Sequence, residues 1–151
     1  MIKAKLKSLG IVLPPAPAPM ANYVSHVISG NLLFLSGQGP RTPEGLWLCG
    51  KVGAEVGVED AYWHARLTGI RLLSVANAAL GSLDRVQRVV KVLGFVNAIP
   101  SFRDHSKVIN GCSDLFVEVF GDAGRHARSA IGVGSLPENT TVEIEAILEI
   151  R

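Results

Sequence analysis

ARSAIGVGSLPENTTVEIEAI, residues 127–147, is the stretch of the chain that decides its fold. It contains one alternating run, Ala127–Val133, then a turn, then the start of a second run, Thr141–Ile150. Successive side chains of a β-strand point to opposite faces. In the second run the apolar residues therefore share one face, and glutamates such as Glu143 and Glu145 share the other. We expect two strands, the second of which lies with its apolar face on helices.

The same alternation places Arg128 among small side chains. Ala130, Gly132 and Gly134 follow it on one face, so we expect open space beside its guanidinium. The planar fork of an arginine forms two parallel hydrogen bonds with a carboxylate, and a glutamate such as Glu143 on the neighbouring strand can orient a water or move a proton. These residues predict a pocket for a small acid on an open sheet face. A plain cross-strand ion pair explains the same pattern, and from the pattern alone it is the more common arrangement.

Upstream of this stretch the hydrophobic period changes between strand and helix. Small residues recur every three or four positions over Val58–Leu80, which predicts a helix that can pack closely on a sheet, and Phe102–Phe120 repeats the helical period. The remaining strands are expected at Tyr23–Ser29, Leu32–Gln38, Leu46–Val52 and Val86–Asn97. This order of elements predicts an α+β sandwich, with a mainly antiparallel sheet and two helices on one of its faces.

The amino-terminal end has a different composition. Residues 14–19 are proline and alanine only, which disfavours helix there, and we expect residues 1–20 to form an extended leader into the first strand. The apolar run Leu9–Leu13 is shorter than the ~7–15 residues of a signal peptide. No segment approaches the ~18 apolar residues of a membrane span. We therefore expect one domain over residues 1–151, located in the cytoplasm and not at a membrane.

Composition and charge argue against several kinds of partner. Hydrophobic residues make up 48% and charged residues 19% of the chain, which is typical of a globular protein. The net charge is +2, and lysine and arginine form no basic block of the kind that binds nucleic acid. The four histidines and the two cysteines, Cys49 and Cys112, match no metal-binding spacing. We expect no metal ion, and a buried, reduced thiol at Cys112.

Four segments together resemble the RidA/YjgF family, the reactive-intermediate deaminase or endoribonuclease L-PSP-like group. The stretch quoted above is similar to the carboxyl-terminal signature of that family. Three upstream segments follow in the order that the family has them: NYV at Asn22–Val24, LFLSGQGP at Leu33–Pro40 and VINGCSDLF at Val108–Phe116. The segment from Arg41 to Tyr62 is longer than in compact members, and it resembles a longer-chain branch of the family.

This resemblance implies a chorismate-mutase-like fold and a homotrimer in which three sheets form a central barrel, with ligand clefts between subunits. It implies hydrolysis of enamines and imines such as 2-aminoacrylate to a 2-oxo acid and ammonia, without a cofactor. By the same resemblance Arg128 holds the substrate carboxylate and Glu143 positions the attacking water. The cleft-lining positions of the family match Tyr23, Ser36, Gly37, Asn110 and Ala130.

Several of these lining residues also have a purely structural explanation. Tyr23 fits a half-buried strand aromatic, Ser36 and Gly37 fit a strand end that needs small residues, and Asn110 fits the polar surface of a helix. Ala130 stands where the family often has a cysteine, which changes the pocket only if the thiol itself takes part.

Three functions compete on this basis. The first is an imine and enamine deaminase. The second is a trimer that binds a small carboxylate without turning it over, because the same arginine serves both purposes. The third is ribonuclease activity or translation inhibition, an older description of family members, which the weak basicity of the chain disfavours.

Overall fold

A five-stranded sheet with two long helices on one face makes up most of the chain, and the computed structural model describes residues 1–18 and 22–151. The strands are β1 (His26–Ser29), β2 (Leu32–Gln38), β3 (Val86–Asn97), β4 (Ala127–Val133) and β5 (Val142–Ile150). The helices are α1 (Ile2–Ser8), α2 (Val58–Leu80) and α3 (His105–Phe120). Short 3-10 turns are η1 (Leu83–Arg85), η2 (Gly121–Gly124) and η3 (Pro137–Asn139).

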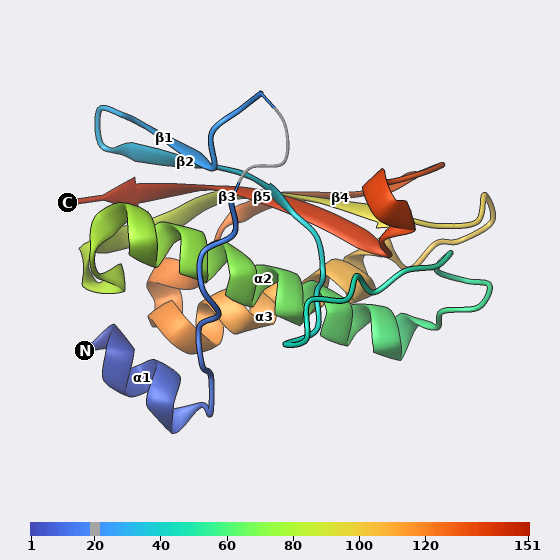
Figure 1. Cartoon of the computed structure of the whole chain (residues 1–151), viewed down its shortest axis with the longest axis horizontal. Helices are drawn as coiled ribbons and strands as arrows, with labels where there is room; N and C mark the ends of the chain where they lie inside the picture. Colours follow the sequence, from blue (N-terminus) through green and yellow to red (C-terminus); the bar gives the residue numbers. More distant parts are fainter. Residues whose placement is uncertain (19–21) are drawn as a thin grey trace.

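The strands lie in the order β1-β2-β5-β3-β4. Neighbouring strands are antiparallel except β3 and β4, which run parallel and are connected through α3. Figure 1 shows α2 and α3 on one side of the sheet, and no helix of the described chain covers the other side. The predicted α+β fold, with a mainly antiparallel sheet and two helices on one face, is confirmed.

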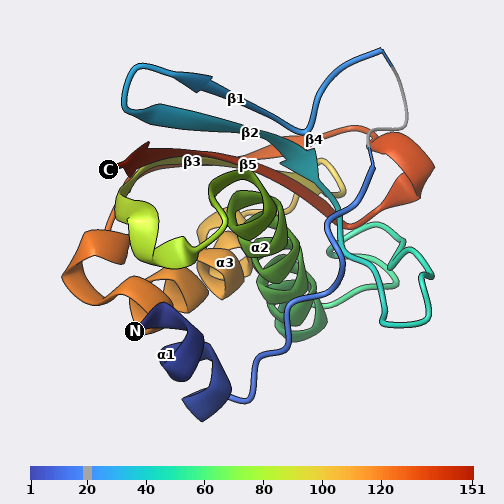
Figure 2. The same cartoon turned by 60° about the vertical axis from the view of Figure 1, so that its left-hand side comes forward.

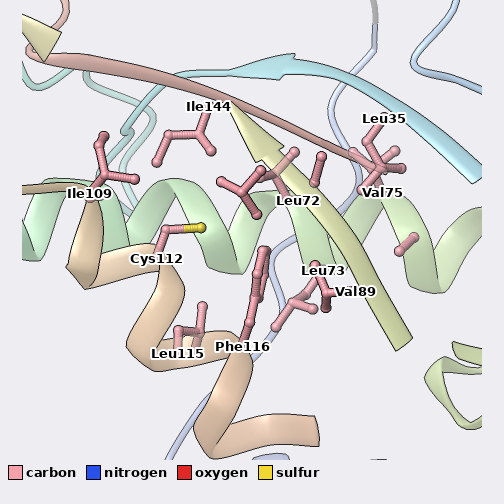
Figure 3. Close-up of a cluster of buried hydrophobic side chains, with 14 of the residues drawn as sticks. Leu35, Leu72, Leu73, Val75, Val89, Ile109, Cys112, Leu115, Phe116 and Ile144 are labelled. Carbon is pink, nitrogen blue, oxygen red and sulfur yellow. The ribbon is translucent and has the colours of Figure 1, made fainter. Parts of the chain in front are cut away.

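The buried core lies between the sheet and these two helices. Alternate residues of β5 from Val142 to Ile150 are buried, as their pattern predicted. Leu72 of α2 and Phe116 of α3 belong to the same buried cluster and approach it from the helical side (Figure 3). Cys112 is fully buried there, which confirms the prediction of a core thiol.

The opposite face of the sheet carries both acidic and apolar side chains. Cross-strand pairing places Phe34 beside Ile147, and it places Phe95 between Glu143 and Ile131. Phe34 remains 39% exposed and Ile131 45% exposed. A sheet face with this many exposed apolar side chains is typical of a surface that meets another protein.

The strand predicted at Leu46–Val52 is wrong. The segment forms only isolated bridges, such as that between Cys49 and Thr140. Glycines turn the chain at both ends of the segment: φ is 89° at Gly45, and it is 129° at Gly50 and 95° at Gly53. Only glycine adopts such angles readily, so a continuous strand is interrupted.

Two other predicted boundaries move by three residues. The first strand begins at His26 and not at Tyr23, because its ladder with β2 extends only from the His26–Leu35 pair to the Ser29–Leu32 pair. The second long helix begins at His105 and not at Phe102, because the Phe102 amide closes a turn onto the Ile99 carbonyl at 3.0 Å.

The extended leader predicted for residues 1–20 is wrong at its start. Ile2–Ser8 forms α1, because its lysines, leucine and alanine are good helix formers. The first amide of this helix donates to the Asp84 carboxylate at 2.8 Å, which holds α1 near η1. Residues 11–18 are not helical, as their prolines predict, and residues 19 and 20 lie outside the described residues. None of the described helices combines the length and the apolar character that crossing a bilayer requires.

The two long helices touch at backbone distance. A Cβ atom added to Gly111 of α3 would lie 1.9 Å from the carbonyl oxygen of Tyr62 in α2. A Cβ atom added to Gly94 of β3 would lie 2.6 Å from Cδ1 of Ile109 in α3. Glycine at these two positions therefore sets how closely α3 approaches both α2 and the sheet.

We expect Gly111→Ala to destabilise the protein, because the new methyl group overlaps a backbone carbonyl that no side-chain rotation moves away. Overpacking of this kind costs about 1–3 kcal/mol of unfolding free energy. Urea unfolding should show a lower midpoint at an unchanged m value. Gly134→Ala is the control, since an added Cβ atom there has nothing within 4 Å. Equal midpoints for the two variants would contradict the close packing.

Candidate functional site

Three of the predicted site residues, Tyr23, Gly37 and Glu143, line one cavity of about 550 Å³. We call it the Glu143 cavity; it lies where β2 ends and β5 begins. A Cβ atom on Gly37 would lie 2.9 Å from Oε2 of Glu143, so the carboxylate rests directly on bare backbone. The Ser36 hydroxyl donates to the Val24 carbonyl at 2.7 Å, which ties β2 to the segment that carries Tyr23.

The environment of Glu143 favours its protonated form. Burial raises the pKa of the Glu143 carboxyl above its usual range, and the negative charge of Glu145 on the same strand face adds to the increase. A carboxylate with a raised pKa is a stronger base, and it takes up a proton at a pH closer to neutral. Such a group suits proton transfer to or from a water molecule.

The predicted residue Arg128 lines a second pocket, of about 240 Å³, that we call the Arg128 pocket, and it contacts the predicted residue Asn110. Nη1 of Arg128 donates to Oδ1 of Asn110 at 2.8 Å and to Oγ of Ser113 at 3.1 Å, both on α3. These two bonds use both hydrogens of Nη1, whereas Nε and Nη2 have no partner in the described part of the chain. Ala130 follows two residues later on the same face and packs partly buried against the core.

His126 extends this network and fixes its direction. Nδ1 of His126 lies 2.6 Å from the Gly124 carbonyl, which only accepts, so Nδ1 carries the proton. Burial lowers the pKa of His126, which favours the neutral ring with a free acceptor at Nε2. The Ser113 hydroxyl, 2.9 Å away, then donates to Nε2 and accepts from Arg128. The arginine is therefore held by a chain of oriented hydrogen bonds.

The structure does not bring Arg128 and Glu143 to one pocket. The prediction that the last two strands are neighbours, with both side chains on one open face, is wrong, because β3 lies between β4 and β5. Arg128 pairs with the buried Val92 on the helix side, whereas Glu143 pairs with Phe95 on the opposite face. Strand geometry places their Cα atoms about 10 Å apart across the sheet and about 10 Å apart along it.

Three residues that the sequence did not single out as site residues, Arg41, Trp47 and Arg71, also line the Glu143 cavity. Arg71 lies beside Leu72 in the buried stripe of α2. An arginine inside a buried helix face is rare unless it has a partner, and that placement is the signal by which it can be found.

Comparison with known proteins agrees with the fold described above. Residues 3–149 match the protein family described as "YjgF/chorismate mutase-like, putative endoribonuclease". Protein TCP17 of Trypanosoma cruzi is 48% identical over 99% of this chain and 94% of its own length. A 2-iminobutanoate/2-iminopropanoate deaminase of Dermatophagoides farinae is 30% identical over 93% of this chain and 95% of its own. The solved structure of Atu1372 from Agrobacterium tumefaciens, of unknown function, has a TM-score of 0.92 at 46% identity and covers 99% of this chain and 92% of its own.

We expect Glu145→Gln to lower the pKa of Glu143, because the substitution removes the neighbouring negative charge and leaves the burial unchanged. A ¹³C NMR titration of the Glu143 carboxyl should show its midpoint at a lower pH than in the wild type. Glu149→Gln removes the same charge four residues further along the strand, on the same face, and is the matched control. If the two variants titrate alike, the repulsion does not come from Glu145.

Proposed function

The chain belongs to the YjgF/RidA family, and on that premise we propose that it hydrolyses imines and enamines of the 2-aminoacrylate type to 2-oxo acids and ammonia. The observation that carries the proposal is the Arg128 guanidinium. Two hydrogen bonds through Nη1 fix its plane, and Nε and Nη2 are left for a ligand. The edge of the guanidinium that carries Nε and Nη2 matches the two oxygens of a carboxylate. The 30% identity to a protein named as an imine deaminase supports the reaction.

The reaction needs Arg128 and Glu143 at one ligand, so the proposal includes a second copy of the chain. In one chain the two residues line different cavities. The uncovered apolar sheet face with Phe34 and Ile131 supports packing against other copies. The proposed assembly is a homotrimer in which the Arg128 pocket of one subunit faces the Glu143 cavity of the next, with Tyr23 and Gly37 lining the latter.

In this composite cleft the chemistry divides between the two residues. Arg128 binds the carboxylate of the substrate and so fixes the imine carbon in place. Glu143 accepts a proton from water as the water oxygen bonds to that carbon, and the C=N π electrons move to nitrogen, which takes up a proton. The carbinolamine hydroxyl then loses its proton while the nitrogen takes up one more, so that the C=O bond forms, the C–N bond breaks, and neutral ammonia leaves. An enamine substrate first takes up a proton on its β-carbon.

A trimer that only binds a small carboxylate is the second candidate. The observation that favours it is that Asn110 and Ser113 of the same chain orient Arg128 without any contribution from Glu143. Binding of a 2-oxo acid together with a lack of turnover for imines would select this candidate over the deaminase.

We expect Arg128→Ala to lower kcat/KM for imines, because the charged hydrogen bonds to the substrate carboxylate are lost. Such a loss costs about 2–4 kcal/mol, equal to roughly 30- to 900-fold. The assay supplies imines from serine or from neutral amino acids, made by a dehydratase or an amino acid oxidase, and follows the 2-oxo acid and ammonia. Arg103→Ala is the control, since Arg103 is exposed and lies outside both cavities. Product formation no faster than in buffer would contradict the proposal for those substrates.

We expect trimers mixed from Arg128→Ala chains and Glu143→Gln chains to regain activity that each variant lacks alone. A cleft between one chain of each kind can combine an intact Arg128 with an intact Glu143. Every mixed cyclic trimer then has one complete cleft, about one third of the wild-type number. Two different affinity tags allow the mixed species to be purified and assayed. Mixed trimers as inactive as the parents would mean that the cleft does not combine residues of two subunits.

A further inference from the structure

Two arginines in the Glu143 cavity lack ordinary partners. Arg71 of α2 is 9% exposed, and its Nη2 donates to Oε1 of Gln38 at 3.2 Å. Its Nε is buried and has no hydrogen-bond partner among the described residues. The same holds for the Nε of Arg41. Buried polar groups of proteins are almost always hydrogen-bonded, so two such atoms in one cavity indicate a missing acceptor.

Both guanidinium groups gather around one aromatic ring. Cζ of Arg41 lies 4.2 Å from the ring centroid of Trp47, and Cζ of Arg71 lies 5.8 Å from the same centroid. The two positive charges are therefore close together. Burial lowers the pKa of Arg71, and the charge of Arg41 lowers it further, which shows the repulsion between them.

The acidic residues of the cavity do not neutralise this pair. Glu138 and Glu143 also line the cavity. However, no carboxylate oxygen of the described chain lies within 4.0 Å of either Arg41 or Arg71. An anion from solution is the simplest counter-charge for two partly desolvated guanidinium groups. The two glutamates favour an anion of low charge, such as a carboxylate, over the more highly charged phosphate.

The segment between β2 and α2 builds this part of the cavity. Arg41 and Trp47 form an antiparallel bridge, and amides on either side of them close the loop, from Thr42 to the Leu46 carbonyl and from Leu48 to the Pro40 carbonyl. Figure 2 shows this loop, in teal, beside α2 and near the turn that contains η3. The loop thus brings Arg41 and the Trp47 ring against Arg71 of the helix.

We propose that Arg41 and Arg71 form an oxyanion site in the Glu143 cavity that binds the second acidic group of a small dicarboxylate. The part of this inference that names a substrate rests on the proposed deaminase function. Arg128 of a neighbouring copy holds the carboxylate next to the reacting carbon, and the arginine pair holds the carboxylate of the side chain. The substrate class is then the imine of an amino acid with an acidic side chain.

The site itself is tested by binding, without any turnover. Isothermal titration of the full-length protein with succinate should show binding that Arg71→Gln and Arg41→Gln each weaken at least tenfold. Pyruvate, which has no second carboxylate, should bind the wild type and both variants alike. Arg66→Gln removes an arginine from the same helix, where it pairs with Glu118 at 3.0 Å, and should change succinate affinity less than twofold. Arg41 lies in a loop, so its variant keeps the test valid if Arg71→Gln does not fold.

Two results would overturn the site. One is succinate binding that is equal in the wild type and in Arg41→Gln. The other is binding of inorganic phosphate that depends on Arg41 without any binding of succinate, which would assign the site to a different anion.

The substrate class is tested by turnover. Imines made from aspartate or glutamate by an amino acid oxidase should be hydrolysed faster than imines from alanine. Arg71→Gln should remove that preference, because it should lower kcat/KM for the acidic imines at least tenfold more than it lowers kcat/KM for the alanine imine. If neither imine is hydrolysed but succinate binding depends on Arg71, the deaminase proposal fails and the oxyanion site stands. If imines are hydrolysed without a preference for acidic ones and succinate does not bind, the inference fails and the deaminase stands.

Discussion

The close approach of α3 to α2 and to β3 is the constraint on which the rest of the structure depends. It exists because Gly111 and Gly94 have no side chain at the two points of contact, where a single added carbon would overlap neighbouring atoms. The position of α3 then decides where its polar side chains lie. Asn110 stands next to Gly111, and Ser113 follows one residue after the buried Cys112, so both reach the edge strand β4. A packing requirement in the core thus orients Arg128 at the edge of the molecule.

The insertion of β3 between β5 and β4 has the second large effect. It places Arg128 on the helix side of the sheet and Glu143 on the opposite side. Each residue has its own surroundings as a result: a network of neutral hydrogen-bond partners for the arginine, and a partly buried site beside another carboxylate for the glutamate. Separated in this way, the two do not neutralise each other as an ion pair. Each keeps a free functional group for a ligand, which agrees with a cleft assembled from two copies.

The Glu143 cavity differs from the Arg128 pocket in how its polarity arises. At the Arg128 pocket, protein oxygen atoms accept the hydrogen bonds that Nη1 of Arg128 donates. The Glu143 cavity instead contains two arginines whose Nε atoms lack acceptors among the described residues, although Trp47 provides a face for both cations. A loop in which the sequence predicted a strand supplies half of this arrangement. The two cavities therefore differ in their need for an anion.

The family resemblance singled out Arg128 and Glu143 as candidate site residues. The sequence patterns by themselves determined the local structure: the alternation in β5, the small face of α2, and the order of the long helices and strands from α2 to β5. These features depend on neighbours within a few residues, so a period of two or of 3.6 is enough to predict them. The same patterns also suggested a pair of adjacent last strands, which was wrong, because strand order depends on contacts between distant segments that no local period encodes. Only the tertiary structure decided that Arg128 and Glu143 lie on opposite faces and that Arg41 meets Arg71 across Trp47. The first outcome follows from the position of β3 between β4 and β5, and the second from how the loop after β2 packs on α2. Such packing is a property of the whole chain.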